Sequence, residues 1–169
     1  MSGDQPIVLV GLMGAGKTPT GTRVAERLGW PFHDGDDELE ARLGITPAAL
    51  AERDGTAGIH ASEAALLLDF LVPARRIVVA ASASTIEDPR CRYALREPFV
   101  AWLHADPAFL APRAGANGKR PVAADVEGRL RDQEARRSPL YAEVADIDFD
   151  VATTPLDAIA AAIVARVQG

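Results

Sequence analysis

Short apolar segments recur along the chain and are separated by stretches with helical periodicity. Residues 7–10, Ile-Val-Leu-Val, form a β-branched apolar run that ends at Gly11, which is typical of a buried strand meeting a glycine break. Further strands are predicted from extended or apolar composition at residues 30–33, 76–81, 99–103 and 147–151.

Amphipathic stretches fill the intervals between these strands. Residues 17–28 carry apolar side chains on one side, and Gly29 ends the predicted helix. Strands that alternate with helices predict a parallel sheet covered on both faces, so we expect one α/β domain over residues 1–169. A second helix is predicted to begin at a cap formed by Asp36 or Asp37 and to end at Gly44. A third is predicted to follow a Thr46 cap, with Pro47 as its first residue. Two more helices are predicted over 61–71 and 156–167.

Composition then narrows the function classes. The chain has 169 residues, with 18 basic and 24 acidic side chains and a formal net charge of −6, which argues against a nucleic-acid or anionic-membrane surface. No apolar run approaches the roughly 18 residues of a membrane span, and no signal-peptide pattern is present at the start. The single Cys91 excludes an internal disulfide and is expected to be a packed thiol. We expect a cytoplasmic monomer whose partner is a small molecule.

The first candidate site follows the first predicted strand. Residues 11–18 match the pattern G-x-x-x-x-G-K-S/T, in which glycines let backbone N–H groups and a helix N-terminus approach phosphate oxygens. Lys17 of this pattern reaches the β- and γ-phosphates, and the Thr18 hydroxyl binds Mg²⁺. Pro19 lacks the N–H that would meet the α-phosphate, so we expect a weakened contact there. The predicted nucleotide-binding residues of the loop are Gly14, Ala15, Gly16, Lys17 and Thr18.

A second candidate site is the acidic turn after the second predicted strand. Asp34 and Asp36 lie at its carboxyl end, the edge at which open α/β sheets bind ligands. One carboxylate can hold Mg²⁺ through water, and the other can accept a proton or a hydrogen bond from a substrate hydroxyl. The alternative is that Asp36 or Asp37 only caps the next helix.

With these motifs in place, the chain resembles the shikimate kinases, a branch of the nucleoside-monophosphate-kinase-like P-loop proteins. The resemblance covers almost the whole chain and implies a three-layer α/β/α P-loop kinase fold, with a central parallel sheet of about five strands and a mobile lid at about residues 113–127. Besides the phosphate loop, the matching segments are residues 32–40 (D-x-D), Asp54-Gly55, Glu63, Asp88-Pro89, Arg92, Lys119-Arg120-Pro121 (lid) and residues 137–141 (R-x-P-L-Y).

The resemblance implies transfer of the ATP γ-phosphoryl group to a hydroxyl of shikimate, with Mg²⁺. Asp34 would support the metal, and Asp36 would bind the hydroxyl that is phosphorylated. Arg113 would stack on adenine, Arg120 would stabilise the transferring phosphoryl group, and Arg137 would grip the substrate carboxylate. The predicted catalytic residues are Lys17, Asp36 and Arg120.

Two segments depart from the family pattern. His60 takes the substrate-side position of an arginine that binds the carboxylate three residues before Glu63, and a mostly neutral imidazole cannot form a guanidinium fork. Ser82-Ala83-Ser84 replaces a Gly-Gly-Gly run. Two alternatives therefore stand beside shikimate phosphorylation: a kinase for another, less anionic polyol, and a catalytically impaired protein that binds nucleotide or metabolite.

Overall fold

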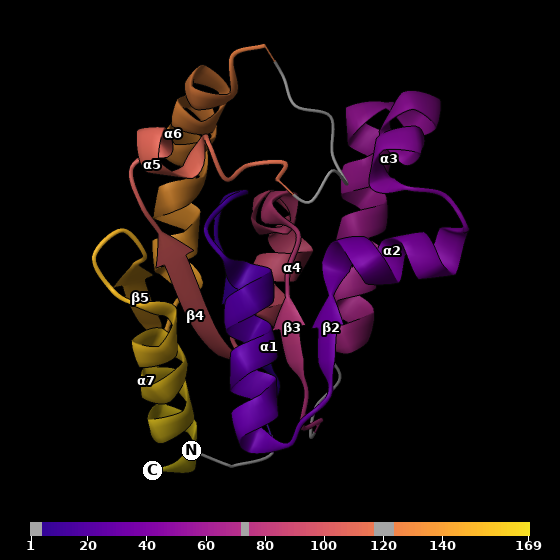
Figure 1. The fold of residues 1–169 in the computed structure, drawn as a ribbon. Coiled ribbons are helices and arrows are strands. Elements are labelled where there is room, and N and C mark those ends of the chain that lie inside the picture. Colours follow the sequence, from indigo (N-terminus) through magenta and orange to yellow (C-terminus); the bar gives the residue numbers. More distant parts are fainter. Residues whose placement is uncertain (1–4, 72–74, 117–123) are drawn as a thin grey trace.

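The fold is built on a five-stranded parallel sheet (Figure 1). The computed structural model describes residues 5–71, 75–116 and 124–169 of the chain. The strand order is β2-β3-β1-β4-β5, and every pairing is parallel. The strands are β1 (Ile7–Val10), β2 (Phe32–Asp34), β3 (Val78–Ala80), β4 (Phe99–His104) and β5 (Ile147–Asp150).

Helices connect these strands and cover the sheet. Within the described ranges, none of them is long and apolar enough to cross a membrane. They are α1 (Lys17–Leu28), α2 (Gly35–Leu43), α3 (Pro47–Phe70), the 3₁₀ helix η1 (Ala83–Glu87), α4 (Pro89–Ala94), α5 (Pro107–Leu110), α6 (Val126–Val144) and α7 (Leu156–Gln168).

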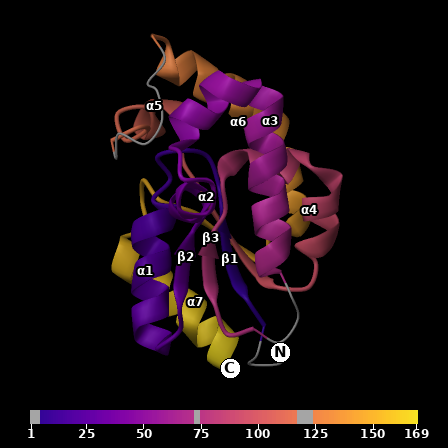
Figure 2. The same ribbon diagram turned by 90° about the vertical axis from the view of Figure 1, so that its right-hand side faces the viewer.

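The sheet lies between two helical layers, as Figure 2 shows. Helices α1 and α7 pack together on one face, and α3, α4 and α6 lie on the other. Two layers arise because the chain steps in one direction along the sheet from β1 to β2 and in the other from β2 to β3, β4 and β5, and right-handed crossovers in opposite directions lie on opposite faces. The strand order brings the carboxyl ends of β2, β3 and β1 side by side at one edge of the sheet, and the residues that follow these strands are therefore neighbours in space.

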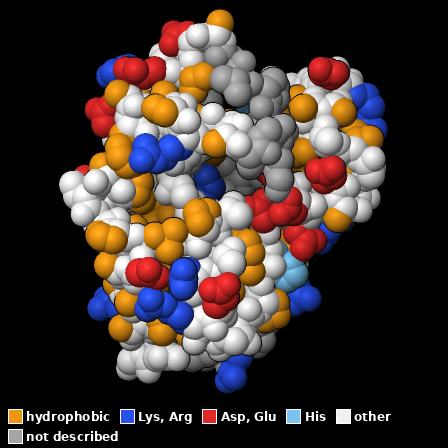
Figure 3. Space-filling model, viewed as in Figure 1, with side chains coloured by type: hydrophobic (Ala, Val, Ile, Leu, Met, Phe, Trp, Pro, Cys, Tyr) orange, Lys and Arg blue, Asp and Glu red, His pale blue; other side chains and the backbone are white. Residues whose placement is uncertain are grey.

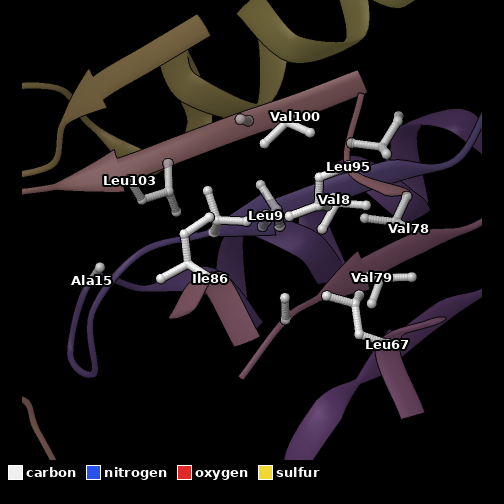
Figure 4. Close-up of a cluster of buried hydrophobic side chains, with 14 of the residues drawn as sticks. Val8, Leu9, Ala15, Leu67, Val78, Val79, Ile86, Leu95, Val100 and Leu103 are labelled. Atoms are coloured by element: carbon white, nitrogen blue, oxygen red, sulfur yellow. The ribbon is translucent and has the colours of Figure 1, made fainter. Parts of the chain in front are cut away.

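The strands are apolar because both faces of the sheet are buried. Ile7, Val8 and Leu9 of β1 are fully buried, and the core cluster gathers side chains of β1, β3 and β4 with those of the helices (Figure 4). Cys91 belongs to this core, where burial raises the pKa of its thiol to about 11, as expected of a packed thiol.

All five predicted strands form, and one helix prediction needs correction. The N-cap of α2 is Asp34, whose carboxylate accepts the backbone N–H groups of Asp36 and Asp37, so neither of those two residues is the cap. Only the residue before the helix has the extended backbone that lets a side chain turn back onto these amides. The helices predicted after Thr46 and over 61–71 both form, and Thr46 is the N-cap of the first. They adjoin in the element α3, where a kink at Gly55, with a φ of 72° and a ψ of 178°, separates them.

Helix α1 approaches the sheet closely at Gly21. A Cβ added there would lie 2.4 Å from Phe32 Cε2 and 2.8 Å from Leu9 Cδ1. We expect Gly21→Ala to lower the free energy of unfolding by about 1–3 kcal/mol, because packed side chains must shift. Urea denaturation measures this, with Thr22→Ala at the next, exposed position expected to change stability by less than about 0.5 kcal/mol. An unchanged midpoint for Gly21→Ala would contradict the close packing.

Candidate active site

A cleft of about 540 Å³ opens beyond the carboxyl ends of β1, β2 and β3. Its walls are the loop between β1 and α1, the turn between β2 and α2, the segment after β3, and Arg113, Gly115 and Ala116. Figure 3 shows a hollow on this face of the molecule, with a basic side chain inside it and acidic side chains at its margin.

The loop between β1 and α1 has the backbone of an anion-binding loop. Gly14 and Gly16 have φ angles of 85° and 80°, values that side chains disfavour. Gly16 is the N-cap of α1 and offers no side chain to the first amide groups of the helix, which leaves these groups for an anion. Lys17 Nζ donates hydrogen bonds to the carbonyl oxygens of Gly11 (2.8 Å) and Leu12 (3.0 Å), so the ammonium lies against the loop.

The loop residues contribute to the cleft unequally. Gly14, Gly16, Lys17 and Thr18 line it, whereas the side chain of Ala15 is buried in the core. Pro19 also lines the cleft, and α1 begins at Lys17 despite the proline. A proline in the first helical turn removes an N–H that has no partner within the helix, and for this reason the helix tolerates it.

One carboxylate links the loop to the acidic turn. Thr18 Oγ1 donates a hydrogen bond of 2.5 Å to Asp34 Oδ2, while Asp34 Oδ1 accepts from the backbone nitrogens of Asp36 (3.0 Å) and Asp37 (3.3 Å). The structure thus brings together the two side chains predicted to hold the metal. A hydroxyl and a carboxylate are oxygen ligands of the kind that Mg²⁺ prefers, so this pair fits the ion.

Asp36 lines the same cleft and contacts the first serine of the substituted run. Ser82 Oγ lies 3.4 Å from Asp36 Oδ1, to which it donates a weak hydrogen bond. A Cβ on Gly35 would approach Ser82 Oγ to 2.9 Å, which shows how closely the serine fills the space beside the turn. The φ of Ser82 is −61°, so the replacement of glycine causes no backbone strain at this residue.

The third residue of the run, Ser84, is buried and donates its hydroxyl to Glu63 Oε2. Glu63 is only 1% exposed. In the family pattern an arginine accompanies this glutamate, but His60 takes the arginine position here. The Ser84 hydroxyl is a hydrogen-bond donor to the Glu63 carboxylate. The signal in the sequence was a polar side chain at a position where the family pattern has glycine.

Arg137 is buried rather than solvated, being 4% exposed. Its Nη2 donates to Glu87 Oε2 (3.3 Å), its Nε lies 3.2 Å from Glu87 Oε1, and its Nη1 donates to Gln133 Oε1 (3.1 Å). Arg136 Nε lies 3.5 Å from the same Glu87 Oε1. Sequence reasoning missed Glu87, and Arg137 is not among the residues that line the cleft described above.

The pKa of Glu87 reflects this environment. Burial acts to raise the pKa of its carboxyl, but the hydrogen bond and charge of Arg137, with the charges of Arg136 and His60, outweigh burial and hold the pKa below its usual range. Glu87 is therefore ionised at neutral pH. His60 is near enough to act on it electrostatically, so the predicted substrate residues His60 and Arg137 share one cluster of charges with Glu87.

Tyr141 connects the R-x-P-L-Y segment to the run after β3. Its hydroxyl donates to the carbonyl oxygen of Ala83 (2.9 Å), and its ring stacks with Trp102 at a centroid distance of 5.8 Å. Burial raises the pKa of the phenol above its ordinary value, so this hydroxyl remains a donor. The contact fixes α6, which carries Arg137, relative to η1.

Of the remaining predicted residues, Arg113 lines the cleft and Arg120 lies outside the described residues, as does the whole Lys119-Arg120-Pro121 segment. The Arg113 guanidinium carbon lies 3.8 Å from the centroid of the Phe109 ring, and Nη1 donates to the Phe109 carbonyl oxygen (2.8 Å). Phe109 thus covers one face of the guanidinium, in the stacking geometry that a base would take.

An anion-binding loop, an oxygen pair suited to Mg²⁺ and a further carboxylate in one cleft are the parts that phosphoryl transfer to a hydroxyl requires. The fold and the site therefore define a P-loop small-molecule kinase. A family model described as shikimate kinase matches residues 13–168. The chain belongs to the shikimate kinase family.

Individual relatives agree with the family model. The shikimate kinase of Bordetella pertussis is 37% identical over 168 residues, which cover 98% of this chain and 79% of the relative. That of Symbiobacterium thermophilum is 35% identical over 166 residues, 96% of this chain and 95% of the relative. A solved structure of the Acinetobacter baumannii shikimate kinase in complex with shikimate superposes with a TM-score of 0.88 at 30% identity, over 97% of this chain and 93% of that chain.

The contact between Ser84 and Glu63 is testable by its effect on stability. We expect Ser84→Ala to lower the free energy of unfolding by about 1–3 kcal/mol, because a buried carboxylate loses a hydrogen-bond donor. Ser62→Ala is the matched control, since the Ser62 hydroxyl bonds within its own helix, to the Gly58 carbonyl oxygen at 3.1 Å. Equal urea midpoints for the two variants would contradict a structural role of the Ser84 hydroxyl.

Proposed function

We propose that the protein transfers the γ-phosphoryl group of ATP to a hydroxyl of shikimate. The observation that carries the proposal is the Asp34 carboxylate, which holds the phosphate loop and the turn that bears Asp36 together in one cleft. Family membership and the relative solved with shikimate support the acceptor. They favour shikimate over a less anionic polyol and over a protein that only binds nucleotide.

On the nucleotide side, we assign phosphate binding to the loop and Lys17. The amide groups at Gly14, Gly16 and the start of α1 would surround the β- and γ-phosphates, with the Lys17 ammonium exchanging carbonyl oxygens for phosphate oxygens. Thr18 and Asp34 would hold Mg²⁺, which when bound neutralises the charge that develops on the phosphate oxygens. Arg113 at the cleft wall is assigned to adenine and Arg120 to the transferring group.

On the acceptor side, Asp36 would accept the proton of the attacking hydroxyl, and Ser82 would hold its carboxylate in one orientation. Arg137 would bind the acceptor carboxylate, with His60 as a neighbouring group. A carboxylate and a hydroxyl fixed at two points leave the acceptor little freedom to misalign, and alignment is a large part of phosphoryl-transfer catalysis.

We further propose that residues 1–169 form one domain and that residues at about 113–127 act as its lid. Arg113, Gly115 and Ala116 line the cleft, which supports the assignment of the first residues of this segment to the lid. Residues 117–123 of the segment lie outside the described residues. A monomeric state, the lack of a nucleic-acid partner and a cytoplasmic location stay predictions from the sequence.

A coupled assay of ATP consumption with and without shikimate tests the proposed reaction. Asp36→Asn should lower kcat by about 10²- to 10⁴-fold, because the amide cannot accept the hydroxyl proton, while binding of ADP is retained. Asp37→Asn is the control, since Asp37 is the exposed neighbour on the same turn and should lose less than about threefold. Absence of shikimate-dependent turnover in the unmodified protein would refute the proposal.

A substitution at Pro19 is expected to strengthen nucleotide binding. Pro19→Ala restores a backbone N–H next to Thr18, and one charge-assisted hydrogen bond contributes about 1.5–3 kcal/mol. We therefore expect the Kd for Mg²⁺-ADP to fall by about tenfold to a hundredfold in titration calorimetry. A Kd equal to that of the unmodified protein would mean that no phosphate oxygen reaches this amide.

A further inference from the structure

The guanidinium assigned to the acceptor carboxylate already has a carboxylate of the protein on it. Glu87, the last residue of η1, faces Arg137 through two oxygen–nitrogen pairs, Oε2 to Nη2 at 3.3 Å and Oε1 to Nε at 3.2 Å. This side-on arrangement, with both oxygens against Nε and one Nη, is a geometry in which arginine binds carboxylate ligands. Glu87 thus occupies an edge that an acceptor would use.

Each nitrogen of the guanidinium faces an oxygen of the protein. The third nitrogen, Nη1, donates to Gln133 Oε1 (3.1 Å), and Arg137 as a whole is 4% exposed. Among the described residues, Nε is a buried side-chain nitrogen whose contact with Glu87 does not have hydrogen-bond geometry. The pair is therefore close but imperfectly aligned, as expected of a contact that a better-placed carboxylate can replace.

The charges of the cluster make the competition electrostatic. Arg136 and Arg137 contribute two positive charges and Glu87 one negative charge, while His60 adds a charge only when it is protonated. An arginine in place of His60 would add a permanent third positive charge. With His60 neutral, an acceptor carboxylate meets a cluster of net charge +1, and the nearest anion, Glu87, repels it.

We propose that Glu87 is a specificity-determining residue that competes with the acceptor carboxylate for Arg137. On binding, a hydroxylated monocarboxylate either displaces Glu87 from Nε and Nη2 or shares the guanidinium with it, and both routes weaken its affinity. This inference rests on the proposed function, because it concerns the acceptor of that reaction. The nucleotide site is built from other residues and is unaffected by Glu87.

The variant Glu87→Gln tests the competition. Glutamine keeps the shape and one acceptor oxygen for Arg137 but removes the charge. We expect the KM for shikimate to fall by about three- to thirtyfold, with kcat and the KM for ATP within about twofold of the unmodified protein. Glu143→Gln is the matched control, because Glu143 lies on α6, the helix that carries Arg137, and its replacement also removes one acidic charge, there paired with Arg96 at 3.7 Å. Its KM for shikimate should not change.

An unchanged or raised KM for shikimate in Glu87→Gln would overturn the proposal, and a raised value would make Glu87 a residue that holds Arg137 in place. Should Glu87→Gln fail to fold, Glu87→Asp gives the same test with a shorter carboxylate that reaches Arg137 less well. Its KM should fall by about twofold or more, and an unchanged or raised value would again overturn the proposal. Lack of shikimate turnover in the unmodified enzyme would refute the proposed function instead.

Discussion

The arrangement of the site depends on the carboxylate of Asp34. One oxygen accepts the hydroxyl of Thr18 in the first turn of α1, and the other accepts the first amides of α2. These two helices start from different strands, and the Asp34 carboxylate joins their N-termini directly. Because Asp34 ends β2 in register with Ala80 of β3, the sheet fixes the position of the carboxylate. One residue at the end of a strand thus positions both the phosphate loop and the acidic turn.

The segment after β3 contacts several charged side chains from other elements. Within residues 82–87, Ser82 contacts Asp36, Ser84 contacts Glu63, and Glu87 contacts Arg137. The departures from the family pattern at 82 and 84 therefore do not leave an empty or disordered wall. They add hydroxyl groups that bond the neighbouring carboxylates. The Ser84 hydroxyl bonds Glu63, the glutamate that follows three residues after His60, and His60 stands where the family pattern has an arginine.

The sequence was sufficient to predict the layers, the five strands and the phosphate loop, because hydrophobic period and a glycine pattern are local properties. It also placed Asp34 and Asp36 at the correct edge, although it assigned the helix cap to the wrong aspartate. It could not predict the partners of Glu63 and Arg137. Ser84 lies 21 positions from Glu63, and Glu87 lies 50 positions from Arg137, so only the packing of η1 against α3 and α6 brings them together.

The most direct test of the account is a two-step calorimetric titration of the unmodified protein, first with Mg²⁺-ADP and then with shikimate added to the ADP complex. The linked loop and turn predict that ADP binds and that shikimate binds to the complex. No heat of binding for ADP at millimolar concentration would contradict the phosphate site. Binding of ADP without binding of shikimate would contradict the assignment of Asp36, Arg137 and their neighbours to the acceptor.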